Sequence, residues 1–174
     1  MNLYNDVLAN RSKEHIRAIA ATVGNHPDRI QELVEFIGTE KKELVQRAAW
    51  ILSYVADAHP EAVSPYLPKL TAYLNDSSAP VALRRNVMRI LQFLPIPENI
   101  HDSVLHYAFT FLQDEKETVA VRVFSMTVIQ RICVHYPELQ YELRLILEHA
   151  LAHQELSPGF INRAKKILAK TPEV

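Results

Sequence analysis

The feature that most constrains the fold of this chain is a recurring plan of two apolar-periodic helices separated by proline. The plan is clearest from Asp114 to His153. Apolar residues recur there at steps of three and four, which places them on one helix face. Those of the first helix are Val119, Val123, Met126, Ile129 and Cys133, and those of the second are Leu139, Leu143, Ile146, Leu147 and Ala150.

Residues at the helix ends support this reading. Asp114 is expected to cap the first helix, with Glu117 completing a start that resembles a capping box. Pro137 ends that helix and opens the next, because a proline in the first turn gives up only an amide hydrogen that has no helical acceptor. Two helices joined by so short a link are expected to pack antiparallel.

The same plan occurs along the rest of the chain. Each first helix carries an arginine, and these recur with a period of roughly 38 residues, as Arg47, Arg84, Arg122 and Arg163. Prolines separate the helices of each unit at Pro60, at Pro95 and Pro97, and at Pro137. We therefore predict a leader at residues 1–11 and one repeat domain at 12–174. Its repeats are 12–39, 40–76, 77–114 and 115–153, followed by a half repeat at 154–174.

Composition excludes several alternatives. Only 3 glycines occur, which argues against phosphate-cradling glycine loops and against a loop-rich β fold. The net charge of −1 gives no overall attraction to nucleic acid or to an acidic membrane. No apolar run approaches the roughly 18 residues of a membrane span, and the N-terminus has no signal-peptide core. A single cysteine, Cys133, cannot form an internal disulfide, so a reducing, cytoplasmic setting is expected.

With its period, its prolines and its arginine in each first helix, the chain resembles the HEAT-repeat family of the armadillo-like superfold. The resemblance implies an all-α, right-handed solenoid of about four and a half helical hairpins. In that family an aspartate near each repeat boundary stacks with an arginine as a ladder. Asp76 with Arg84 and Asp114 with Arg122 match this pattern, whereas Thr39 stands where the acid ahead of Arg47 would be.

No catalytic constellation is visible, so the chain is not expected to be an enzyme, and no cofactor or metal is expected. His149 and His153 lie on one helix face, but zinc needs further ligands. Cys133 lies between apolar neighbours and is expected to be an inert core thiol. Two basic clusters are interpreted mainly as ladder and helix-end charges. They are Arg84, Arg85 and Arg89, and Arg163, Lys165, Lys166 and Lys170.

In the family the second helices line a concave face. Side chains of these helices at the margin of the apolar stripes, or off them, are therefore candidates for binding a partner. They are Tyr66, Tyr73, His106, Tyr141 and Leu145. The alternative is that they pack between neighbouring repeats, because solenoid helices bury more than one face. The leading interpretation is a scaffold that binds a protein or peptide. The runner-up is a nucleic-acid-binding or base-modifying repeat protein, which would need a basic groove.

Overall fold

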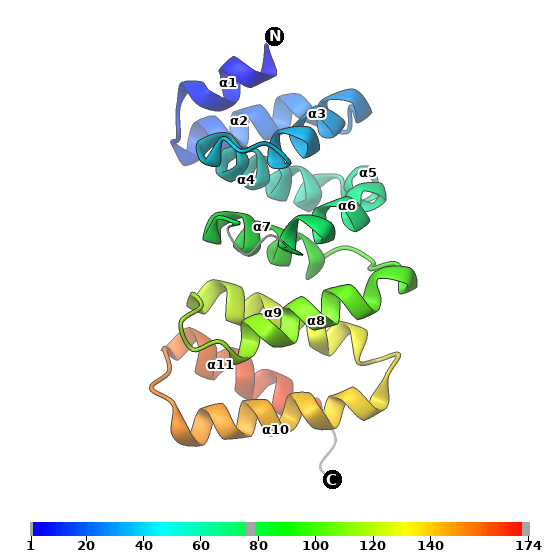
Figure 1. Cartoon of the computed structure of the whole chain (residues 1–174), viewed down its shortest axis with the longest axis vertical. Coiled ribbons are helices and arrows are strands. Elements are labelled where there is room, and N and C mark those ends of the chain that lie inside the picture. The colour runs from blue at the N-terminus through cyan, green and yellow to red at the C-terminus, as the bar shows by residue number, and fades with distance from the viewer. Residues whose placement is uncertain (1, 76–78, 172–174) are drawn as a thin grey trace. The chain divides into compact units, whose positions relative to one another are not determined.

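The computed structural model describes residues 2–75 and 79–171, and none of these residues lies in a strand. This confirms the all-α class (Figure 1). The helices α5 and α6 form one nearly continuous helix, interrupted by the 3₁₀ turn η1. The elements are α1 (Leu3–Ala9), α2 (Lys13–Val23), α3 (Pro27–Ile37), α4 (Lys42–Ala58), α5 (Pro60–Val63), η1 (Ser64–Tyr66), α6 (Leu67–Ala72), η2 (Tyr73–Asn75), α7 (Val81–Leu91), η3 (Glu98–Ile100), α8 (His101–Gln113), α9 (Val119–Ile132), α10 (Pro137–His153) and α11 (Pro158–Leu168).

Helix starts follow the capping residues in most places. Ser12 and Ser157 accept hydrogen bonds from the backbone amides of His15 and Phe160, so each side chain satisfies an amide of the first helical turn. Prolines open α3, α5, α10 and α11 as their missing amide hydrogen allows. Gly24 ends α2 with a φ of 52°, a left-handed conformation that glycine adopts without steric cost.

The expected helix start at Asp114 is wrong. Asp114 ends α8 instead, and α9 begins at Val119 after Thr118. The carboxylates of this linker satisfy its own backbone, since Asp114 accepts from the amide of Lys116 and Glu117 from that of Thr118. Short polar side chains of this kind favour turns as much as helix caps, which is why the pattern was misleading.

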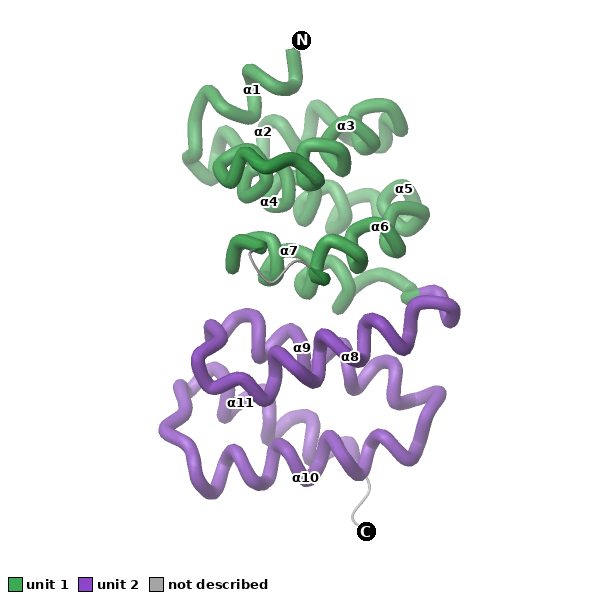
Figure 2. The backbone as a smooth tube through the Cα atoms, in the orientation of Figure 1, with its two compact units in different colours: residues 1–96 green, residues 97–174 purple. Residues whose placement is uncertain are grey.

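The chain divides into two compact units, residues 1–96 and 97–174, and the boundary lies in the Leu94-Pro95-Ile96-Pro97 segment (Figure 2). In unit 1 the long helix α4 packs against α1, α2, α3 and α7. Its side chains from Leu44 to Ala56 are buried on most of the helix surface. A helix covered on several sides in this way needs apolar residues beyond a single stripe.

Unit 2 has the same construction around α9, which packs against α8, α10 and α11. Its core includes Met126 and Ile129 of α9, Leu143 and Leu147 of α10, and Phe160 of α11, all almost fully buried. The stripes expected for α9 and α10 therefore face this core for the most part. Val119 was wrongly placed on the stripe, since it is 45% exposed at the start of α9, and Val123, Leu139 and Ile146 are only partly buried. No helix in the described ranges has both the length and the apolarity needed to cross a membrane.

The stripe assignment of α10 can be tested with one substitution at two positions. Leu143 is 1% exposed and Leu145 is 47% exposed. Leu143→Asp should lower the free energy of unfolding by about 3 kcal/mol or more, because it leaves an unpaired charge and a misfilled core site. Leu145→Asp should change it by less than about 1 kcal/mol. Equal urea midpoints for the two variants would show that the buried face was assigned wrongly.

Candidate functional site

The exposed face of α10 carries two large apolar side chains one helical turn apart. Tyr141 is 49% exposed and Leu145 is 47% exposed, whereas Leu143 and Leu147 on the opposite face are buried. Residues at a spacing of four share a helix face, so the ring and the leucine form one patch. The structure therefore brings these two predicted binding residues together on the surface of unit 2.

A pocket of about 360 Å³ adjoins this patch, between the end of α8, the start of α9 and the second half of α10. Leu145, Ile146 and His149 line it from α10, and Leu112 lines it from α8. Arg122 and Gln154 supply polar groups to its wall, and Glu115 supplies a carboxylate. The pocket thus combines apolar lining with a few hydrogen-bonding groups, a mixture typical of ligand and peptide sites.

Carboxylates flank the apolar patch. Glu138, Glu142 and Glu148 are exposed on α10, and Glu148 forms an ion pair with Arg144 at 2.8 Å. By helical spacing Glu142 and Glu148 fall on either side of the line from Tyr141 to Leu145. This face of α10 is therefore apolar along its centre and acidic at its margins.

Arg122 forms one wall of the pocket and is held rigidly. The residue is 7% exposed, and its Nε donates to the Leu112 carbonyl at 3.0 Å and its Nη2 to Gln154 Oε1 at 2.8 Å. It also lies 4.5 Å from the centre of the Phe160 ring. Burial lowers the pKa of Arg122, and the charges of Glu115 and Asp114 oppose that shift. These contacts join α8, α9, α11 and the end of α10.

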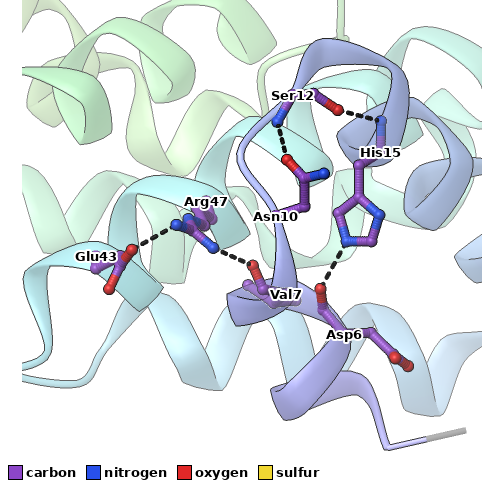
Figure 3. Close-up of polar contacts among 7 residues, drawn as sticks. All are labelled: Asp6, Val7, Asn10, Ser12, His15, Glu43 and Arg47. Atoms are coloured by element: carbon purple, nitrogen blue, oxygen red, sulfur yellow. Dashed lines mark hydrogen bonds and ion pairs between the residues drawn. The ribbon is translucent and has the colours of Figure 1, made fainter.

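The predicted boundary ladder has other hydrogen-bond acceptors in the structure. The charge of Asp114 opposes the lowering of the pKa of Arg122 by burial, but the Arg122 guanidinium donates its hydrogen bonds to the Leu112 carbonyl and the Gln154 side-chain amide. Arg84 donates to the Ala79 carbonyl at 2.7 Å, and its proposed partner Asp76 lies outside the described residues. Arg47 donates to the Val7 carbonyl at 3.1 Å and pairs with Glu43, as Figure 3 shows. Arg47, Arg84 and Arg122 thus each donate to a backbone carbonyl, whereas Arg163 donates to the Thr127 hydroxyl at 2.6 Å.

Tyr66 and Tyr73 belong to unit 1 and are half-buried. The Tyr66 hydroxyl approaches the Pro27 carbonyl at 3.5 Å, and the Tyr73 hydroxyl donates to the Val34 carbonyl at 3.3 Å. The Tyr73 ring lies so close to Gly38 that a Cβ there would stand 2.6 Å from its hydroxyl. Both tyrosines contact the neighbouring helix α3. Such contacts fit the alternative in which these side chains pack between neighbouring helices rather than bind a partner.

His106 of α8 is exposed, and its ring lies edge-on to Tyr107 with 5.3 Å between centroids. The rings of His149 and His153 are 4.7 Å apart. Within the described residues no three His, Cys, Asp or Glu side chains are grouped so as to hold a metal ion.

Burial, with the charges of Glu142 and Glu138, raises the pKa of the Cys133 thiol to about 12, so it stays protonated at neutral pH.

Sequence reasoning did not single out Gln154 or the flanking glutamates, and it assigned Ile146 to the buried stripe. A full helical projection of α10 would have found the glutamates, because they lie on the same side as Tyr141. Gln154 gave no such signal, since it follows the last turn of α10 and is placed by the fold next to Arg122. The sequence reasoning also missed a cluster of Arg17, Tyr54 and Arg89 in unit 1.

Antiparallel helices packed in tandem, with equivalent residues returning at a fixed period, define a helical-repeat protein. The particular class follows from a family comparison, in which the HEAT repeat domain matches residues 4–171. The chain belongs to the HEAT-repeat family, as its resemblance implied. Neither a curated protein nor a solved structure matches it.

The burial of Arg122 predicts that it matters more for stability than Arg144. The side chain of Arg144 is 17% exposed and holds Glu148 and the Thr171 carbonyl near the chain end. Arg122→Ala should lower the free energy of unfolding by about 1.5–3 kcal/mol, because buried acceptors lose a charged donor. Arg144→Ala should cost about 0–1 kcal/mol, because its partner Glu148 is 46% exposed and solvent weakens the ion pair. Urea titration measures both, and coinciding midpoints would contradict the inferred role of Arg122.

The contact between Gly38 and Tyr73 predicts a coupled pair. Gly38→Ala should destabilise the wild-type chain by about 1–3 kcal/mol, because the new methyl group overpacks against the Tyr73 ring. With Tyr73→Ala present, the same change should be neutral or slightly stabilising, since φ at Gly38 is −82° and suits alanine. A double-mutant cycle followed by thermal melting measures the coupling. Additive effects would mean that Tyr73 does not pack on Gly38.

Proposed function

We propose that the protein is a non-enzymatic scaffold that binds a protein or peptide segment on the exposed face of α10 in unit 2. HEAT repeats are generally protein-interaction scaffolds, and that supports the class of function. The observation that carries the location is the exposed pair Tyr141 and Leu145 beside the pocket lined by Ile146 and His149. Exposed aromatic and aliphatic side chains next to a pocket are common anchors of interfaces.

The charges around the patch indicate the chemistry of the partner. Glu138, Glu142 and Glu148 surround the apolar centre, with Glu115 at the pocket. A matching segment would present apolar side chains flanked by lysine or arginine, as a basic amphipathic helix does. Its apolar side chain would enter the pocket, and its cations would meet the glutamates at the rim. The same acidic margin disfavours a phosphate backbone on this face.

His106 also belongs to unit 2, whereas Tyr66 and Tyr73 belong to unit 1. We assign His106 no contact with the segment, because the patch is complete without it. The contacts of Tyr66 and Tyr73 with α3 carbonyls support a packing role for those rings. That either ring also meets a partner stays a prediction.

The proposal predicts a sequence preference that peptide selection can measure. A random peptide library displayed on phage should yield, on the whole chain, peptides with apolar residues at helical spacing next to lysine or arginine. Binding of a selected peptide should weaken about tenfold or more with Tyr141→Ala or Leu145→Ala, because interface anchors are worth about 2 kcal/mol each. Glu142→Lys should weaken it through charge repulsion.

Tyr4→Ala is the matched control, because Tyr4 is also an exposed tyrosine, at 40%, but lies on α1 in unit 1. Melting curves show whether each variant keeps its fold. Wild-type affinity in both the Tyr141 and the Leu145 variant would place binding elsewhere. Selected peptides that are acidic would contradict the stated chemistry even if α10 binds them.

A further inference from the structure

A second cluster lies in unit 1, where three side chains from three helices meet. Tyr54 of α4 is in contact with Arg17 of α2 and Arg89 of α7. The guanidinium carbon of Arg17 lies 5.3 Å from the centre of the Tyr54 ring, and that of Arg89 lies 5.0 Å from it. Both distances are those of cation–π contacts. Arg89 also forms an ion pair with Asp57 of α4.

The donors of this cluster converge on one oxygen. The side chains of Trp50, Arg17 and Arg89 each favour the ionised form of the Tyr54 hydroxyl and lower its pKa. Burial opposes ionisation of Tyr54, but the hydrogen bonds of Trp50 and Arg17 and the charge of Arg17 outweigh it, so its pKa is lower than usual. Both guanidinium groups therefore lie close to the same phenol, that of Arg17 from α2 and that of Arg89 from α7.

This arrangement has more positive than negative charge. Two guanidinium groups share one neutral phenol, and the carboxylate that pairs with them is that of Asp57, next to Arg89. Arg85 is exposed on α7 one turn before Arg89, and α2 has the cation Lys13 and the carboxylate Glu14 exposed one turn before Arg17. Cations placed so close together repel each other, and an anion bound between them would relieve that repulsion.

We propose that Arg17, Tyr54 and Arg89 form a binding site for a phosphate-type oxyanion, either free phosphate or a phosphate monoester on a partner protein. A tetrahedral anion offers several acceptor oxygens, which suits donors that approach from different helices. Guanidinium groups favour phosphate because they present several N–H donors in a fixed plane. The site lies in unit 1, so it does not depend on the peptide surface of α10.

A bound dianion has a measurable effect on Tyr54 that a purely structural contact does not. It would oppose ionisation of the phenol, so the pKa of Tyr54 should rise when phosphate binds. The groups that shift this pKa are Trp50 on α4, Arg17 on α2 and Arg89 on α7, and Asp57 on α4 pairs with Arg89. NMR of the whole chain with carbon-13-labelled tyrosine follows the titration, and Tyr54→Phe identifies the signal.

The experiment titrates inorganic phosphate against chloride at matched ionic strength. We expect phosphate to raise the pKa of Tyr54 while the other tyrosines titrate as before. Arg17→Gln and Arg89→Gln should each weaken phosphate binding about tenfold, since a hydrogen bond to a charged group is worth about 1.5–3 kcal/mol. Arg29→Gln is the control, because Arg29 is a half-buried arginine of unit 1 that serves the Thr22 carbonyl.

Two peptides that differ only in a phosphoserine separate the possible sources of the anion. Tighter binding of the phosphorylated peptide than of free phosphate supports a phosphorylated partner, and equal binding supports free phosphate. If an arginine variant fails to fold, Tyr54→Phe keeps the test open, because it removes one hydroxyl donor and should weaken phosphate binding. A Tyr54 signal that titrates identically in phosphate and chloride would overturn the proposal, as would undiminished binding in folded Arg17→Gln and Arg89→Gln variants.

Discussion

An amphipathic helix cannot bury its apolar stripe alone, and every other feature of this structure depends on that constraint. The helices α4 and α9 show its full effect, because neighbours on several sides bury most of their circumference. The helix α10 shows the opposite case. Although it is as long as α4, only Leu143, Leu147 and Ala150 of its side chains are fully buried. A helix packed on one side has a face left over, and here that face carries the candidate partner surface.

Arginine side chains solve a second problem that follows from packing short helices. The last carbonyls of a helix have no amide partner within it, and burying them unpaired is unfavourable. Arg47 reaches the end of α1 at Val7, and Arg122 reaches the end of α8 at Leu112. Arginine suits this task because its guanidinium has several donors on a long stem, and it also complements the negative end of the helix dipole.

The same contacts show what the sequence could predict and what it could not. Apolar spacing identified the buried faces of α9 and α10, because burial acts on side chains whose positions follow from helical geometry. Recurrence at the repeat period identified Arg47, Arg84 and Arg122 as residues with a structural role in each repeat. Their acceptors were missed, because a backbone carbonyl leaves no trace in the residue types. The Asp114 cap was also wrong, since the same side chain serves equally well in the linker that follows α8.

The net charge of this chain does not show how its charged side chains are distributed over the surface. The total of −1 argues against a strongly charged partner only if charges are evenly mixed. The charges are not evenly mixed, because glutamates surround the apolar centre of the α10 face in unit 2. In unit 1, Arg17 and Arg89 converge on Tyr54. The Debye length is roughly 8 Å at physiological ionic strength, and charges farther apart than this are largely screened from one another. A ligand therefore responds to the local cluster, and a nearly neutral chain can carry surfaces of opposite preference.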